Sequence, residues 1–275
     1  MTDYRLLVDI WVKKEFEDKF EERMETFLTR GSFRFFHPDF DNRLVLALKR
    51  ECSPVDLDMH STRYPVADIL QSRKGRHPDK SSSNGSTHCH YVHLWTMPDL
   101  EDLHLARRMQ YCSEDSEYMG LDELVERETQ NLVRRVRWQL QPSDPNPDSL
   151  FVLKTCRFEY GRLGEYLLRI RGLIPAMKRK DWDQLGQFQQ VTGTLNTVTE
   201  FWQTEDKDWT SSSSELWEGL LAGRIEGEEL PFWPEENEII PIWWNHEIFE
   251  CPRYFKGPGF AERCDRLLGF LRKAS

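Results

Sequence analysis

The sequence lacks most of the signals by which common protein classes are identified. It contains no run of about 18 apolar residues, which excludes a membrane-spanning helix and a membrane as partner. It also contains no Walker motif, dinucleotide-binding glycine fingerprint or G-x-S-x-G elbow, so the usual kinase, Rossmann and hydrolase classes are not indicated. The segment 1–5 has no apolar signal core and no arginine-rich leader, which predicts a cytoplasmic protein.

Cysteine and basic residues are also scarce. The six cysteines are scattered over 275 residues without a C-x-x-C pair, so neither a zinc module nor a disulfide framework is predicted. Lys and Arg number 37 against 47 Asp and Glu, which gives a net charge of −10. Because phosphate binding requires a surplus of basic residues, this balance argues against nucleic acid as the main partner.

Large apolar side chains are abundant. Hydrophobic residues make up 39% of the chain, and the ten Trp and sixteen Phe supply enough apolar volume for a folded core or a cavity wall. A chain of this length buries roughly three quarters of the surface that it exposes when unfolded. We therefore expect a globular protein that needs no disulfide or metal to fold.

The first half reads as strands and helices in a β-α-β-β-α-β order. Strands are predicted at 6–12, 44–48, 90–97 and 132–138, and apolar residues at helical spacing predict a helix over 16–27. A short helix is expected after Pro98, and a further one near 121–128. The polar stretch 51–87 interrupts this order and is predicted to be an insertion loop at a cavity mouth.

The same order repeats after a proline-rich linker at 141–149. Strands are predicted at 151–158, 187–191, 197–202 and 239–249, with helices at 163–170, after the Ser212–Glu215 capping box, and in a C-terminal segment at 260–271. Each half thus has the ferredoxin-like order. The predicted organisation is one half over 1–140, the linker, and a second half over 150–275.

One strand carries a family resemblance. The stretch from Gly193 to Trp202, GTLNTVTEFW, resembles the G-x-L-N-x-x-x-H-x-W strand of the NIPSNAP family, within the dimeric α+β barrel superfamily. Glu200 stands where that pattern has His. In the first half, His93 and Trp95 keep the His and Trp of the pattern, whereas Cys89 replaces its Asn.

The resemblance implies an α+β fold in which two tandem ferredoxin-like repeats form a fused, pseudo-dimeric barrel around a cavity. The superfamily includes cofactor-independent cyclases and monooxygenases, haem enzymes, and proteins of unclear activity. The fold alone does not determine which of these activities a member has. A further homodimer is compatible with the resemblance.

Strand alternation selects the candidate site residues. Residues two apart share a face, so Tyr91, His93 and Trp95 should lie together, as should Asn196, Glu200 and Trp202. We predict that His93 and Glu200 enter one cavity from opposite sheets as catalytic acid/base groups, because an imidazole and a carboxylate can exchange protons near neutral pH. The predicted substrate-binding residues are Tyr91, Trp95, Asn196, Trp202, Asp9, Trp11 and Lys154.

Two alternatives involve a metal or haem. His88 and His90 share the other face of their strand and are weak candidates for metal ligands, although no metal-binding spacing accompanies them, so no metal site is predicted. No cofactor is predicted, and haem with an axial His93 or His246 is the runner-up.

The leading hypothesis is a cofactor-independent enzyme of cyclase, isomerase, lyase or monooxygenase type that acts on a small hydrophobic molecule. The alternatives are a haem- or metal-dependent barrel enzyme and a non-catalytic binding or interaction protein.

Overall fold

The computed structural model describes residues 4–29, 44–52, 86–96, 121, 123–136, 144–179, 181–205 and 243–257. Several predicted elements lie outside these residues: most of the 51–87 insertion, the helices after Pro98 and Ser212, and the C-terminal helix. No helix in the described ranges is long and apolar enough to cross a membrane.

The first half contributes four strands and one long helix. They are β1 (Tyr4–Lys13), α1 (Glu17–Thr29), β2 (Leu44–Cys52), β3 (His88–Thr96) and β4 (Val125–Arg135), with the single-turn η1 (Lys14–Phe16) leading into α1. The strands are antiparallel in the order β2-β3-β1-β4. In α1, Phe20, Met24 and Leu28 recur every four residues and are buried, as an amphipathic helix packed on a sheet requires.

The second half repeats the arrangement. It contains β5 (Leu150–Arg157), α7 (Leu163–Lys178), β6 (Trp182–Gln190), β7 (Thr197–Thr204) and β8 (Trp243–Phe249), with the strands in the order β6-β7-β5-β8. Each half therefore has its first strand between its third and its fourth, which is the strand order of a ferredoxin-like repeat. This confirms the predicted α+β class with two ferredoxin-like repeats.

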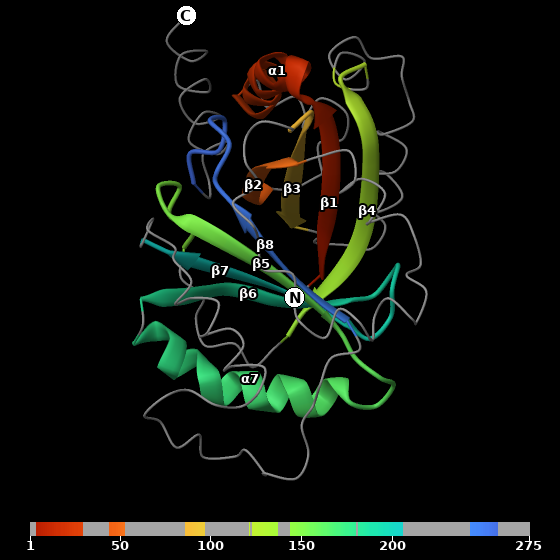
Figure 1. The fold of residues 1–275 in the computed structure, drawn as a ribbon, viewed down its shortest axis with the longest axis vertical. Helices are drawn as coiled ribbons and strands as arrows, with labels where there is room; N and C mark the ends of the chain where they lie inside the picture. The colour runs from red at the N-terminus through yellow and green to blue at the C-terminus, as the bar shows by residue number, and fades with distance from the viewer. Residues whose placement is uncertain are drawn as a thin grey trace, which may run out of the picture.

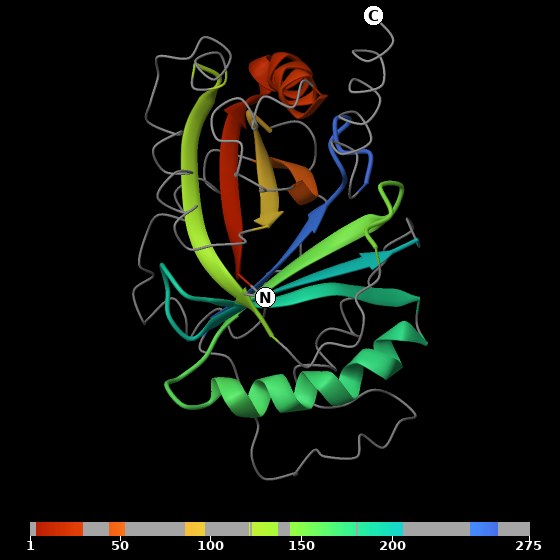
Figure 2. The same cartoon turned by 180° about the vertical axis from the view of Figure 1, so that it is seen from behind.

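The two halves join along both edges of their sheets. On one side β4 pairs with β6, for example Arg135 opposite Phe188. On the other side Lys49 of β2 and Glu250, directly after β8, exchange two backbone hydrogen bonds of 2.7 and 2.9 Å. The eight strands thus form a closed barrel, and Figures 1 and 2 show its two sheets crossing at a wide angle.

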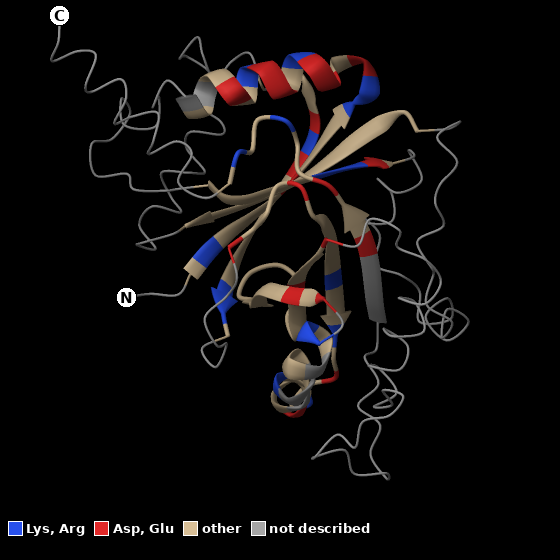
Figure 3. Ribbon diagram, turned by 90° about the vertical axis from the view of Figure 1, so that its left-hand side faces the viewer, with Lys and Arg blue, Asp and Glu red and all other residues tan. Residues whose placement is uncertain are grey.

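The helices cover the outer faces of the barrel. In Figure 1, α1 lies beyond the first sheet and α7 beyond the second, at opposite ends of the molecule. Figure 3 shows α1 banded with acidic and basic residues, while its buried residues Phe20, Met24 and Leu28 belong to the same core cluster as residues of the first sheet. Most strands are consequently buried on both faces, one against a helix and one inside the barrel, whereas β4 is mainly half-buried. In β7 every residue is buried.

One predicted helix is wrong. We expected a helix near 121–128, but β4 begins at Val125 and pairs with β1 from Val125 to Arg134. The segment is polar and favours a helix by composition, yet β1 offers a complete row of backbone partners. Tertiary pairing overrides local propensity here, as it commonly does for strands.

Candidate functional site

The pairing register decides which side chains enter the barrel. Residues opposite each other in an antiparallel pair lie on the same face, so Trp11 shares a face with His90, and Val8 shares a face with His93. Tyr91, on the face of His93, packs against Phe20 of α1 with ring centroids 4.6 Å apart and the rings tilted by 45°. The face of His93 is therefore the helix-covered outer face, and the face of His90 is the interior.

His93 and Glu200 do not meet in one cavity. His93 lies in the layer between the first sheet and α1, whereas Glu200 lies in the layer between the second sheet and α7, where it contacts Tyr166 of that helix. Strand alternation groups the residues of each strand correctly, but the face that we predicted to line the cavity is the outer face, which the helices cover. The expected acid/base pair across a shared cavity is therefore wrong in its geometry.

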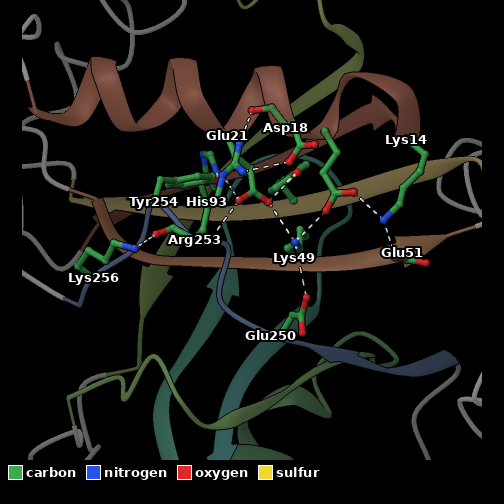
Figure 4. A network of polar contacts seen from close by, with 12 residues as sticks. Lys14, Asp18, Glu21, Lys49, Glu51, His93, Glu250, Arg253, Tyr254 and Lys256 are labelled. Carbon is green, nitrogen blue, oxygen red and sulfur yellow. Dashed lines mark hydrogen bonds and ion pairs between the residues drawn. The ribbon is translucent and has the colours of Figure 1, made fainter.

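The layer under α1 holds Tyr91, His93 and Trp95. The Tyr91 hydroxyl donates to Glu21 of α1 at 3.2 Å, and His93 Nε2 contacts the hydroxyl of Tyr254 at 2.5 Å. Figure 4 shows His93 and Tyr254 between α1 and the sheet, beside the ion pair of Lys49 and Glu21. Burial lowers the pKa of His93 to about 3, so its imidazole is neutral at physiological pH.

The layer under α7 is organised around the Glu200 carboxylate, whose side chain is 1% exposed. It accepts hydrogen bonds from Tyr166 at 2.7 Å, from the Gln187 amide at 2.8 Å and from the Trp202 indole at 3.1 Å. The Lys154 ammonium donates to the Tyr166 hydroxyl at 2.7 Å and lies 3.7 Å from Glu200. Lys154, Glu200 and Trp202 are thus brought together, but outside the barrel interior.

The position of Asn196 also differs from our prediction. We placed it on the strand face of Glu200, but β7 begins at Thr197, and Asn196 lies in the preceding turn with φ = 58°. Asn tolerates this left-handed conformation better than most residues. Its carbonyl accepts a hydrogen bond from the Phe158 amide at 2.9 Å, so its backbone contacts the residue directly after β5.

Polar groups do enter the barrel interior, from a different set of positions. Asp9 Oδ1 lies 2.9 Å from His90 Nε2, and Arg50 Nε donates to His90 Nδ1 at 3.3 Å. Arg50 also forms an ion pair of 2.5 Å with Glu247 of β8. We call these four residues, Asp9, His90, Arg50 and Glu247, the interior cluster; they come from β1, β3, β2 and β8.

Aromatic rings support the interior cluster. The Trp11 indole is stacked parallel on the His90 imidazole with centroids 4.6 Å apart. The Arg127 guanidinium lies 4.9 Å from the Trp11 ring on the β4 side, and Phe249 packs edge-on against His90 at 5.6 Å. Stacking and hydrogen bonding together fix the plane of the imidazole, which pre-organises its nitrogens.

The electrostatics of the interior cluster favour a neutral imidazole. His90 is fully buried, and this burial lowers its pKa, although the adjacent Asp9 partly opposes the shift. Because Arg50 donates to Nδ1, the proton of the neutral ring lies on Nε2 and is donated to Asp9. Nδ1 is then the basic atom. The side chains of Asp9 and Arg50 remain 17% and 18% exposed, which gives solvent a route to the cluster.

Arg50, Arg127 and Glu247 were missed by the sequence analysis. Each belongs to a strand whose pairing partners are distant in the sequence, so only the register places it near His90. Alternation gave one usable signal, because Asp9 and Trp11 share a face and were both expected to line a cavity. Both do lie on the interior face.

Metal and haem fit the described residues poorly. Both ring nitrogens of His88 are engaged, Nδ1 with Thr87 at 2.8 Å and Nε2 with Glu126 at 2.7 Å. Within the described ranges, no three His, Cys, Asp or Glu side chains are grouped as metal ligands. Both ring nitrogens of His90 and the Nε2 of His93 also have hydrogen-bond partners. The side chain of His246, the other candidate axial ligand, lies outside the part of the chain that the structure describes.

A small cavity opens at the other end of the barrel. Its volume is about 100 Å³, and its wall is mainly apolar. It begins near Arg5, and six residues of β1, or about 20 Å, separate Arg5 from Trp11 at the interior cluster. The hydrophobic cavity and the acid/base groups therefore occupy opposite ends of the barrel, whereas we had expected them in one place. The lining residues are Arg5, Val45, Leu46, Leu94, Arg135, Asp144, Pro145, Leu185, Gly186, Phe188 and Phe201.

Comparison with known proteins gives matches at the level of structure. No family model matches the sequence, and no curated protein matches it. A protein from Fusobacterium nucleatum assigned as a monooxygenase superposes with a TM-score of 0.50 and 9% identity, covering 94% of this chain and 96% of that one.

Two further structures are similar. A protein from Lactobacillus acidophilus, also assigned as a monooxygenase, gives a TM-score of 0.48 with 5% identity over 90% of this chain and 93% of that one. A NIPSNAP domain protein from Burkholderia xenovorans covers 36% of this chain and 90% of its own, with 19% identity and a TM-score of 0.24. At these identities the matches concern the fold alone, which is an α+β barrel of two ferredoxin-like repeats.

Proposed function

We propose that this protein is a cofactor-independent enzyme that transfers protons on a small hydrophobic molecule, with the interior cluster as its active site. The observation that carries the proposal is the contact between the half-buried Asp9 and the fully buried His90, which faces the interior of the barrel as a neutral imidazole held in one tautomer. Residues such as His90, whose pKa is shifted by burial beside a specific charged partner, are concentrated at functional sites.

Each residue of the cluster has a distinct role in this proposal. His90 Nδ1 is the general base, and Asp9 orients the ring and stabilises the imidazolium that forms when a proton is accepted. Arg50 contacts Nδ1 at a long 3.3 Å and is also held by Glu247, so an entering substrate can displace the weaker contact. The guanidinium groups of Arg50 and Arg127 stabilise the negative charge that develops on the substrate.

This chemistry covers several reaction classes. Removal of a proton from an activated carbon or a phenol is the first step of a cyclisation, an isomerisation or an elimination. A carbanion that reacts with dioxygen begins with the same proton transfer. The interior cluster supports the proton removal that these reactions share. Whether a monooxygenase reaction follows would depend on the substrate.

The two buried histidines of β3 provide a matched test. His90 faces the interior and His93 faces α1, so His90→Gln and His93→Gln remove the same group from opposite faces of one strand. The assay follows solvent deuterium exchange at the acidic C–H of anthrone and 2-tetralone by NMR. We expect the wild type to accelerate exchange, His90→Gln to lose about 100-fold or more, and His93→Gln to retain the rate when both variants are folded.

Two results would overturn the proposal. One is a wild-type protein that does not accelerate exchange with either probe. The other is a loss of rate in His93→Gln while His90→Gln stays active, which would place the chemistry under α1.

A second candidate is a binding protein without chemistry, as the NIPSNAP resemblance allows. One observation favours it: the core cluster is continuous across the barrel, with Leu94 of the first half and Phe201 of the second in one contiguous set of buried residues. A barrel filled in this way leaves little room for a large substrate. Binding of a small molecule without any His90-dependent exchange would support this candidate.

A further inference from the structure

The second strand of each half contains a β-bulge at the same position of the repeat. In the first half the register of β2 against β3 shifts at Val45, and in the second half the register of β6 against β7 shifts at Leu185. Each bulge lies beside the tryptophan of its partner strand, Trp95 in β3 and Trp202 in β7. Bulges are used to redirect side chains, so one that recurs at an equivalent position in both halves is a functional feature of the repeat.

The two bulges meet at one cavity. It is the cavity of about 100 Å³ at the end of the barrel opposite the interior cluster, and both bulge residues line it. The residue after each bulge and the residue that pairs with it in the partner strand line it as well. The equivalent pairs from the two halves are Val45 and Leu185, Leu46 and Gly186, and Leu94 and Phe201. The cavity is therefore built by the repeat, where the two halves face each other.

The two halves contribute unequal side chains to this wall. Leu46 in the first half corresponds to Gly186 in the second, which has no side chain. A Cβ at position 186 would overlap the ring of Phe188, and that ring lines the cavity and packs edge-on against Phe201 with centroids 5.7 Å apart. The glycine thus gives the Phe188 ring its place in the cavity wall.

The inner part of the wall is apolar. The side chains of Leu46, Leu94, Phe188 and Phe201 carry no polar group, and these residues are only 1% to 4% exposed. The charged residues of the lining are half-buried or exposed, so they lie nearer the solvent. A ligand that enters the inner part gains dispersion contacts and loses contact with water, which favours an apolar group over a polar one.

We propose that this cavity is a binding site for a small neutral apolar molecule, held between the two bulges. An apolar cavity of about 150 Å³ in another protein holds benzene, so the smaller volume here restricts the ligand to a compact ring or branched chain of about five carbons. The ligand contacts strands of both halves, and binding to the native state stabilises the closed barrel. The site is separate from the interior cluster and goes beyond the proposed enzymatic activity.

The binding test compares cyclopentane with tetrahydrofuran, two rings that differ by an oxygen in place of one CH₂ group. Each is titrated into the full chain, and the methyl groups are followed by NMR. Saturable shifts with cyclopentane are expected at the methyl groups of Val45, Leu46, Leu94 and Leu185. The methyl groups of Leu168 and Leu195, which are exposed and do not line the cavity, should not respond. We expect cyclopentane to bind at least tenfold more tightly, because the ether oxygen loses its hydrogen bonds with water at an apolar wall.

Two glycines provide a matched pair of variants. Gly186→Ala forces the Phe188 ring to move and should weaken cyclopentane binding at least tenfold. Gly164→Ala makes the same chemical change at an exposed position of α7, where a Cβ would have no neighbour within 4 Å, and should leave binding unchanged. Phe188→Leu tests the site in the opposite direction, because it enlarges the cavity and should tighten binding of the larger methylcyclohexane about tenfold.

The inference fails if cyclopentane shows no saturable binding, if the two rings bind equally, or if Gly164→Ala and Gly186→Ala have equal effects. It also fails if Phe188→Leu gives no gain for methylcyclohexane, a result that can be read even when Gly186→Ala does not fold. Binding is measured without the deuterium-exchange assay. A protein without His90-dependent exchange can therefore still bind cyclopentane, and an active enzyme can fail to bind it, so the two proposals are tested separately.

Discussion

Single residues differ in how completely their buried polar groups are satisfied. The Glu200 carboxylate accepts three hydrogen bonds and lies beside the Lys154 ammonium, so its capacity is filled by the protein itself. The basic nitrogen of His90 accepts a long hydrogen bond of 3.3 Å from Arg50, whose guanidinium is also ion-paired with Glu247. This contrast is why we assign a structural role to Glu200 and a chemical role to His90.

Removal of the Glu200 carboxylate should destabilise the fold strongly. Glu200→Ala leaves the Lys154 ammonium buried without its partner, a change that typically costs about 3–5 kcal/mol. The expected result is a lower urea midpoint with little change in slope. Glu205→Ala, at an exposed carboxylate just after β7, should change the free energy of unfolding by about 0.5 kcal/mol or less. Replacing both charges, as in Lys154→Met with Glu200→Leu, should recover much of the loss; a double variant no better than Glu200→Ala would contradict this account.

His93 should make stability depend on pH in a defined window. Its folded pKa is about 3 and its unfolded value is about 6.5, so below pH 6.5 the unfolded chain binds a proton that the native protein does not. Stability should therefore fall as the pH falls from 6.5 towards 3, and His93 should contribute a loss of about 2 kcal/mol between pH 7 and pH 5. Urea unfolding of His93→Gln over this range should show a shallower dependence than the wild type. Parallel curves for the two proteins would rule out a buried neutral imidazole at this position.

At the scale of elements, the two long helices are attached to the barrel in different ways. α7 packs through an apolar face that includes Tyr166, Leu167 and Ile170. α1 is additionally held by the segment after β8. There Arg253 contacts Asp18 and Glu21, the Tyr254 hydroxyl contacts His93, and Lys256 donates to the carbonyl of Arg253 (Figure 4). The first half thus depends on residues from the end of the second.

Loss of the Tyr254 side chain should loosen α1 selectively. Tyr254 is fully buried, and truncation of a buried aromatic ring to alanine costs about 3–5 kcal/mol. We expect Tyr254→Ala to increase amide hydrogen exchange in α1 more than in α7, measured by mass spectrometry under native conditions. Tyr254→Phe keeps the ring and loses only the contact to His93, so its effect should be about 1 kcal/mol. Equal increases in both helices would show that the segment does not act on α1 in particular.

At the scale of the whole molecule, the difference between local periodicity and long-range packing explains which predictions succeed. The repeat of strands and helices follows from local periodicity, and it correctly gives two ferredoxin-like halves. Alternation also groups Tyr91, His93 and Trp95 on one face. It does not say which face is interior, because the helix layer and the barrel core bury both, and the burial of β3 and β7 is almost uniform. Contacts with the helices settle that question, such as those of Tyr91 with Phe20 of α1 and of Glu200 with Tyr166 of α7, and they depend on long-range packing.

The closed barrel should unfold as one unit. Phe201 of β7 and Phe188 of β6 pack edge-on at 5.7 Å, and they share one core cluster with Leu94 of β3 and other first-half residues. Phe201→Ala creates a cavity in this shared core and should cost about 3–5 kcal/mol. Because the core belongs to both halves, native-state hydrogen exchange should show β3 and β7 losing protection by the same amount. Leu195→Ala, at a side chain that is 63% exposed, serves as the control and should change neither strand. Loss of protection in β7 with β3 unaffected would mean that the halves fold independently and meet only at their edges, which the continuous core argues against.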